Sequence, residues 1–148
     1  FSISDSELKM GLLSVTKNTG LQGRWQVIQH NPKVICDTAH NKEGLMYVMQ
    51  QLLLETFKKL HIVIGAVNDK DLGTVIPLFP KNAIYYFCKP NVPRGLDAEI
   101  LQNNFLEYNI QGEVYKSVEE ALSKAKSNAS NSDLIFVGGS TFVVAEII

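Results

Sequence analysis

Asp37 and His40 are the first residues of this 148-residue chain whose types and spacing can support chemistry. Asp37 directly follows the apolar run Val34–Cys36, which is typical of a strand buried on both faces, and His40 lies three residues further on, at the expected start of a helix. A carboxylate in this place can accept hydrogen bonds from the two vicinal hydroxyls of a ribose, or it can orient an imidazole. The spacing equally allows a simpler interpretation, in which Asp37 caps the helix and His40 is a polar residue of its first turn.

A second candidate is the turn Gly138–Ser140, which follows the apolar run Leu134–Val137 and precedes a final helix. The backbone N–H groups of such a turn form a small nest that can hold a carboxylate or a phosphate. The alternative is a tight turn in which Ser140 is only the N-cap of the helix. The turn is not a P-loop, because neither G-x-x-x-x-G-K-[ST] nor G-x-G-x-x-G occurs in the sequence.

Several charged residues stand in segments that are expected to be loops. Arg24 follows Gly23, and its planar guanidinium suits bidentate contact with a phosphate. Asp69 and Lys70 follow another apolar run, and Arg94 lies in a Pro- and Asn-rich stretch. Charged residues on loops are usually only solvated, so each of these is a weak candidate when taken alone.

The cysteines and the remaining histidines are expected to carry no chemistry. Cys36 and Cys88 match neither a disulfide framework nor a metal cluster, which favours a reducing compartment, the cytoplasm. The carboxylate beside Cys36 should raise its pKa, which argues against a catalytic thiolate. His30 and His61 have no partners at metal-ligand spacing, so we expect both at the surface or at a strand edge and no metal site in this chain.

The elements that must position these residues alternate between strand and helix patterns. This alternation predicts an α/β fold, a three-layer Rossmann-like domain with a mostly parallel sheet and helices on both faces. Ligands of such sheets bind outside the carboxyl ends of the strands, where the candidate residues are expected to converge. The helix nearest the amino terminus is expected to pack on whatever part of the protein precedes it as well as on the domain itself. We expect helices at about 5–17, 41–57, 97–108 and from 117, and strands at about 25–28, 34–36, 62–64, 83–87, 114–115 and 134–137.

Composition fits a single packed domain and excludes some partners. Hydrophobic residues make up 45% and charged residues 20% of the sequence. Fourteen Lys and Arg against fifteen Asp and Glu leave a net charge of −1, so no overall field attracts nucleic acid or an anionic membrane. No apolar run approaches the roughly 20 residues that cross a bilayer. Because the sequence begins at Phe1 and ends in an apolar run, we expect it to be part of a larger protein.

Taken in order, these motifs resemble one family, the carboxy-terminal domain of folylpolyglutamate synthase/dihydrofolate synthase in the Mur ligase superfamily. The resemblance extends over about residues 4–148, and its most specific part is the D-x-A-H-N pattern at 37–41 preceded by Gly23 and Arg24. The segments that carry it are Gly23–Ile28, Pro32–Asn41, Asp69–Asp71, Asn91–Asp97 and Gly139–Ser140.

The resemblance implies an ATP-dependent amide ligase. A carboxylate of folate or dihydropteroate would be phosphorylated by ATP, and the amine of L-glutamate would attack the acyl phosphate. Arg24 would contact the ATP phosphates, Asp37 would hold the ribose, and Ser140 would bind a glutamate carboxylate. His40 would lie where nucleotide and glutamate meet, as the catalytic residue of this domain. For five further residues only a place on the same rim is implied: Asn41, Asp69, Lys70, Arg94 and Gly139.

The resemblance also implies a division of labour. The family's amino-terminal domain supplies the P-loop, the Mg²⁺ sites and most of the folate pocket, and the carboxy-terminal domain closes over ATP. We therefore expect residues 1–148 to be one domain of a monomeric enzyme, partnered by its own amino-terminal domain and inactive alone.

Two other interpretations of the sequence remain open at this point. A peptidoglycan-precursor Mur ligase shares the architecture, although residues 37–41 look more like the folate branch. A non-catalytic α/β interaction module or receiver-like domain would use the rim residues as caps and turns. Asp37 is a possible phosphoacceptor of a receiver, but the paired acids expected upstream are missing.

Overall fold

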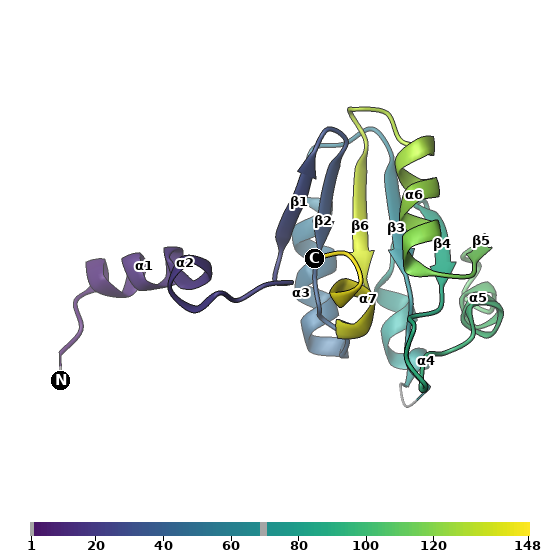
Figure 1. Cartoon of the computed structure of the whole chain (residues 1–148), viewed down its shortest axis with the longest axis horizontal. Coiled ribbons are helices and arrows are strands. Elements are labelled where there is room, and N and C mark those ends of the chain that lie inside the picture. The colour runs from purple at the N-terminus through teal and green to yellow at the C-terminus, as the bar shows by residue number, and fades with distance from the viewer. Residues whose placement is uncertain (1, 69–70) are drawn as a thin grey trace.

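A single mixed sheet organises the chain, in a computed structural model that describes residues 2–68 and 71–148. Within these residues six strands lie in the order β1-β2-β6-β3-β4-β5. β1 is antiparallel to β2, and the other neighbours are parallel (Figure 1). The strands are β1 Gln26–His30, β2 Lys33–Cys36, β3 Leu60–Ile64, β4 Ile84–Cys88, β5 Gly112–Tyr115 and β6 Leu134–Gly138.

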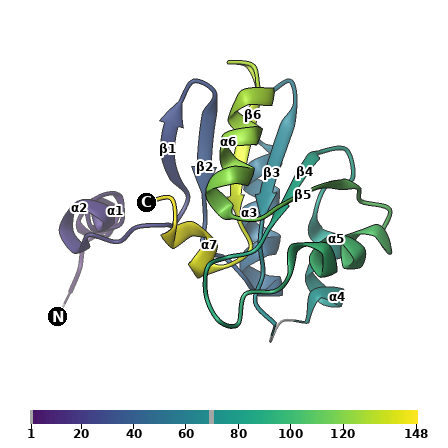
Figure 2. The same cartoon turned by 45° about the vertical axis from the view of Figure 1, so that its right-hand side comes forward.

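Helices cover both faces of this sheet, which confirms the predicted three-layer α/β fold. One face carries α3 Lys42–Leu53, α4 Leu72–Val75, the 3₁₀ turn η1 Ile76–Leu78 and α5 Ala98–Leu106. The other face carries α6 Val118–Asn128 and α7 Thr141–Ala145 (Figures 1 and 2). Because β3 and β6 are covered on both sides, every residue of these two strands is buried, as the apolar runs at 62–64 and 134–137 predict.

The strand order places a topological switch point at the carboxyl end of β6. β6 is inserted between β2 and β3. The chain leaves β2 and β3 toward the helical layer of α3 and α4, but it leaves β6 toward the layer of α7 (Figure 2). Loops that diverge to opposite faces open a crevice at this edge, which is where open α/β sheets bind ligands.

The amino-terminal segment differs from its prediction. The expected single helix at 5–17 is two helices, α1 Asp5–Leu13 and α2 Val15–Thr19. Its predicted capping box is confirmed, because Ser4 Oγ accepts from the Glu7 N–H and Glu7 accepts from the Ser4 N–H. The predicted packing on the domain is wrong, because neither helix has a buried residue and both project away from the sheet (Figures 1 and 2). The apolar residues of α1 do not form one stripe, so no single face of this helix favours burial.

Two further predictions are corrected by the structure. α3 ends at Leu53 rather than near residue 57, because the amides of Leu54 and Glu55 already bond to carbonyls three residues back, which tightens and terminates the helix. His61 is not at the surface, since only 1% of it is exposed. It lies near the amino end of β3, a central strand whose two faces are both covered. In the described ranges no helix has the length and apolar composition needed to cross a membrane.

Candidate active site at the carboxyl edge of the sheet

Asp37 links two segments at the end of β2. Its carboxylate is 5% exposed, and its two oxygens accept hydrogen bonds from the backbone N–H groups of Trp25 and Ala39, both at 2.7 Å. The N-cap of α3 is instead Asn41, whose side chain accepts from the Gly44 N–H at 2.9 Å. The simpler interpretation of Asp37 as the helix cap is therefore wrong: Asp37 joins the loop before β1 to the loop after β2.

Arg24 is held beside Asp37 by an unusual backbone. Gly23 and Trp25, on either side of it, have φ angles of +70° and +44°. For a bulky residue such as Trp25 this left-handed conformation costs on the order of 1–3 kcal/mol, and the bond from its N–H to Asp37 offsets that cost. The Gly23 carbonyl accepts from the Thr38 N–H at 2.8 Å, which closes the loop against residues 37–39. The two residues predicted to bind nucleotide thus lie together, with the Arg24 side chain exposed.

His40 is exposed at the start of the same rim. It precedes the N-cap Asn41, so it is not in the first turn of α3 as the simpler interpretation required. Its Nδ1 lies 3.0 Å from the Thr38 carbonyl, which can only accept a hydrogen bond. Nδ1 therefore carries a proton, and in the neutral imidazole Nε2 is the acceptor that His40 can offer a ligand.

The turn after β6 lies against the end of β3. Gly139 has a φ of +89°, and a Cβ there would be 2.6 Å from the Gly65 carbonyl oxygen, so no other residue fits this position without distortion. Ser140 is buried, and its Oγ accepts from the Phe142 N–H at 3.2 Å. The interpretation of Ser140 as an N-cap is confirmed, and its hydroxyl still has a proton to donate. Gly139 and His40 line one small, mainly apolar cavity, so the ends of β2, β3 and β6 converge as predicted.

Arg94 reaches the same edge from the loop between β4 and α5. Its carbonyl accepts from the Asn68 N–H at 2.9 Å, in the segment that follows β3. Its guanidinium carbon lies 5.0 Å from the centre of the Phe142 ring, in the first turn of α7. Asp69 and Lys70, the other predicted rim residues, lie outside the described residues.

Neither cysteine is available as a nucleophile. Both are buried free thiols. Burial, with the Asp37 charge beside it, raises the pKa of Cys36 to about 11, as the sequence predicted in direction. Burial also raises the pKa of Cys88. At neutral pH both remain protonated, so the chemistry of the rim depends on its oxygen and nitrogen groups.

A metal site is not formed by the part of the chain that the structure describes. Among residues 2–68 and 71–148, no three His, Cys, Asp or Glu side chains lie close enough together to hold an ion. The residues present therefore do not fit a resident metal, and no metal ligand is assigned to them.

The sequence did not reveal two contributions to this site. The Trp25 N–H that fixes Asp37 and the Phe142 ring under Arg94 both depend on contacts between segments far apart in the chain. The one local signal was Gly23, a residue that permits the left-handed backbone beside Arg24.

Comparison with known proteins now identifies the family. Residues 23–141 match the family described as Mur ligase, glutamate ligase domain. The chain belongs to the Mur ligase family. The dihydrofolate synthase/folylpolyglutamate synthase of Escherichia coli (strain K12) is 30% identical over 147 residues, which are 98% of this chain and 33% of that protein. This Mur ligase domain therefore spans about a third of the length of that relative.

Two solved structures have the same fold as this Mur ligase domain. E. coli FolC in complex with DHPP and ADP superimposes with a TM-score of 0.85 at 28% identity, over 99% of this chain and 34% of that one. A bifunctional folylpolyglutamate synthase/dihydrofolate synthase with Mn, AMPPNP and L-glutamate bound gives 0.83 at 27% identity, over 99% and 34% of the two chains. The predicted homology with the carboxy-terminal domain of this ligase family is confirmed, and the receiver-like interpretation is excluded.

Proposed function

We propose that this chain is the carboxy-terminal domain of a longer ATP-dependent ligase that adds L-glutamate to folate or dihydropteroate. The observation that carries the proposal is the buried Asp37 carboxylate, which joins the loop of Arg24 to the loop of His40. It is supported by the homology with a dihydrofolate synthase/folylpolyglutamate synthase and by neighbours that bind ADP, or AMPPNP and L-glutamate. In this reaction the terminal phosphoryl group of ATP passes to the folate carboxylate, and ADP leaves.

The nucleotide is assigned to Arg24 and Asp37. Each Asp37 oxygen accepts one backbone N–H and keeps a second lone pair, which suits the two hydroxyls of a ribose. The exposed Arg24 guanidinium, whose backbone is fixed one residue from the Trp25–Asp37 bond, suits the phosphates. A carboxylate and a guanidinium held on adjacent loops can thus bind two ends of one nucleotide.

The incoming glutamate is assigned to His40 and Ser140. His40 Nε2, an acceptor in the tautomer set by Thr38, accepts a hydrogen bond from the glutamate amine. The Ser140 hydroxyl donates to a glutamate carboxylate. The amine nitrogen attacks the acyl phosphate carbon, the C–O bond to phosphate breaks, inorganic phosphate leaves, and His40 Nε2 takes the proton that the amine loses as the amide forms. His40 is therefore the catalytic residue of this domain.

The remaining assignments belong to the same proposal. Asn41, Asp69, Lys70, Arg94 and Gly139 form the rim around the two substrates. The divalent metal is Mg²⁺ and is held by an amino-terminal domain that precedes this one in the polypeptide. The enzyme is a monomer of the cytoplasm, and closure of this domain excludes water that would hydrolyse the acyl phosphate.

The proposal is tested on the longer protein encoded by the same gene. With ATP, L-glutamate and either dihydropteroate or a folate, it should form ADP and the glutamylated product, and Asp37→Asn should raise the KM for ATP at least tenfold. Glu107→Gln, the same carboxylate-to-amide change on an exposed residue at the end of α5, should leave the KM unchanged. Activity only with a peptidoglycan precursor, or activity of residues 1–148 alone, would contradict the proposal.

A further inference from the structure

Gly23 lies where the loop of Arg24 packs against two other segments of the rim. It is buried, and its φ of +70° lies in the left-handed region. A Cβ placed on it would be 2.8 Å from Thr38 Cγ2, in the segment after β2, and 3.1 Å from Val144 Cγ1, in α7. The Gly23 carbonyl also accepts from the Thr38 N–H at 2.8 Å. Gly23 therefore joins the loop of Arg24 to the segment that carries His40.

Thr38 connects Gly23 with the imidazole of His40. Its N–H donates to the Gly23 carbonyl, and its own carbonyl lies 3.0 Å from His40 Nδ1, from which it accepts. The Thr38 side chain is only 8% exposed, and a β-branched side chain has few alternatives at χ1 when it is buried. A displacement of this side chain away from Gly23 is therefore passed to the backbone carbonyl that fixes the His40 ring.

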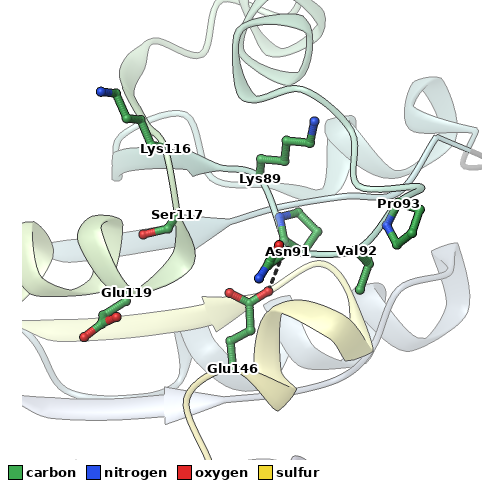
Figure 3. Close-up of a pocket in the computed structure, with 9 residues that line it drawn as sticks. Lys89, Asn91, Val92, Pro93, Lys116, Ser117, Glu119 and Glu146 are labelled. Carbon is green, nitrogen blue, oxygen red and sulfur yellow. Dashed lines mark hydrogen bonds between the residues drawn. The ribbon is translucent and has the colours of Figure 1, made fainter.

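The other neighbour of Gly23, helix α7, is held at both ends. Val144 is fully buried, and the helix begins at its N-cap Ser140, in the turn after β6. Just past the other end of the helix, the Glu146 carboxylate accepts from the Asn91 N–H at 2.6 Å, as the dashed line in Figure 3 shows. A side chain added at Gly23 would thus meet a fixed helix on one side and would displace its nearer neighbour, the segment after β2.

A second glycine separates backbone strain from close contact. Gly20 has a φ of +66°, almost the same as that of Gly23. Among the residues that the structure describes, and apart from the chain neighbours of Gly20, no atom lies within 4 Å of a Cβ placed on it. An alanine is strained by its backbone at either position, but its methyl group meets other side chains at position 23. An effect on His40 that Gly23→Ala shows and Gly20→Ala does not show is therefore due to contact.

We propose that Gly23 is a positioning residue for His40. Its lack of a side chain lets Thr38 pack against it, and the Thr38 carbonyl in turn keeps the proton of the neutral imidazole on Nδ1, so that Nε2 can accept from the incoming amine. This inference rests on the proposed function for the identity of that amine. The loop that carries Arg24, assigned to the nucleotide, thus also orients the imidazole assigned to the amino acid.

The first experiment is steady-state kinetics on the longer enzyme with all substrates saturating. Gly23→Ala should lower kcat about 10- to 100-fold, because displacing a catalytic group by about 1 Å can cost roughly 10²-fold. Gly20→Ala, the control for backbone strain, should leave kcat unchanged. Equal kcat values of the two variants would overturn the proposal.

Two double variants identify the contact that matters. Thr38→Ser removes Cγ2 and keeps the hydroxyl, so Gly23→Ala/Thr38→Ser should recover the kcat of Thr38→Ser alone. Gly23→Ala/Val144→Ala relieves the contact with α7 instead and should stay as slow as Gly23→Ala. Because each double variant relieves one contact, the pair carries the same comparison even if Gly23→Ala alone does not fold. Recovery with Val144→Ala, and none with Thr38→Ser, would overturn the proposal.

The second experiment reads the tautomer of His40 and does not depend on activity. Long-range proton–nitrogen correlation spectra of the longer protein, recorded where the imidazole is neutral, should show His40 Nδ1 protonated and Nε2 unprotonated. The signals are assigned by their loss in His40→Gln. Gly23→Ala should move both signals toward a mixture of the two tautomers, and Gly20→Ala should not. An unchanged tautomer in Gly23→Ala would overturn the positioning role even if the enzyme is a glutamate ligase, whereas an inactive protein with the expected shifts would overturn only the proposed function.

Discussion

The two edges of the sheet each hold a buried aspartate, and both aspartates accept hydrogen bonds from two backbone N–H groups. At the carboxyl edge Asp37, 5% exposed, accepts from the N–H groups of Trp25 and Ala39. At the amino edge Asp133, 6% exposed, accepts from the N–H groups of Lys59 at 3.0 Å and Ser130 at 2.7 Å. Each carboxylate therefore links two chain segments, so this hydrogen-bond pattern alone does not distinguish a binding site from a purely structural contact.

The histidines at the two edges make the difference. His40 is exposed, and its Nδ1 lies 3.0 Å from the Thr38 carbonyl, which leaves Nε2 as the ring nitrogen that it can offer a ligand. His61 is buried, its Nδ1 lies 2.9 Å from the Tyr86 hydroxyl, and its Nε2 is 3.6 Å from Asp133 without a hydrogen-bond partner among the described residues. The Tyr86 hydroxyl is in turn contacted by Asn128 at the end of α6. α6 covers the amino edge, whereas the loops at the carboxyl edge diverge to opposite faces of the sheet. The same residue types therefore support structure at the amino edge and, under the proposed function, bind substrates at the carboxyl edge.

The largest expected effect separates the two histidines by activity. His40→Ala should lower kcat/KM of the longer enzyme at least ~100-fold, because a positioned imidazole that contacts the reacting amine contributes about 10²–10⁴-fold. Its free energy of unfolding should change by less than about 0.5 kcal/mol, since the side chain is exposed. His61→Ala is the matched control at the other edge, where we expect reduced stability with an unchanged KM. If His40→Ala had normal activity but a strongly reduced free energy of unfolding, His40 would be a structural residue and the assignment of the two histidines would be contradicted.

The next effect is on stability at the amino edge. Asp133→Ala should lower the free energy of unfolding by about 2–4 kcal/mol, because it removes the buried charged acceptor of the Lys59 and Ser130 N–H groups and the carboxylate near His61. Urea denaturation measures the change, and kinetics of the longer enzyme should show unchanged KM values. A raised KM for ATP or L-glutamate in Asp133→Ala would mean that the two edges are coupled and that the amino edge also affects substrate binding.

Prediction from sequence succeeded where burial is two-sided and failed where contacts are long-range. The apolar runs at 34–36 and 134–137 identified strands covered on both faces, because such strands are mostly apolar. His61 was misplaced because a polar residue inside such a strand needs partners, and Tyr86 and Asp133 come from other elements. The candidate site residues were proposed from their places at strand ends and from the resemblance, and their roles stay predictions. The contact of Arg94 with Phe142 joins segments that no local pattern connects.

A smaller effect is expected at Gly139, in the turn after β6 at the carboxyl edge. Gly139→Ala should lower the free energy of unfolding by about 1–3 kcal/mol, because its φ of +89° is strained for alanine and the added Cβ would meet the Gly65 carbonyl at 2.6 Å. Gly73→Ala in α4 is the control, since its nearest neighbour would be 3.4 Å away. Thermal denaturation compares the two variants. Equal stability of both would show that the ends of β3 and β6 can separate, and the rim would then be a less rigid site than the amino edge.

The smallest effect is a pH dependence of the free energy of unfolding that we expect from His61 at the amino edge. Burial lowers the pKa of His61, and the nearby Asp133 charge opposes this only in part. Below the ordinary histidine pKa of about 6.5, the unfolded chain therefore takes up a proton that the folded chain does not, so the free energy of unfolding falls as the pH is lowered, with a slope of at most about 1.4 kcal/mol per pH unit for this one group. Urea denaturation between about pH 8 and pH 5 should give a shallower slope for His61→Gln than for the unchanged chain.

The Asp133 pKa is also lowered, since hydrogen bonds from Ser130 and Lys59 outweigh its burial, but its contribution to the free energy of unfolding is lost only near and below its ordinary value of 3.8. Identical slopes above pH 5 would mean that His61 binds its proton in the folded chain as readily as in the unfolded one. The amino edge would then hold an ion pair between His61 and Asp133 rather than a neutral, buried histidine.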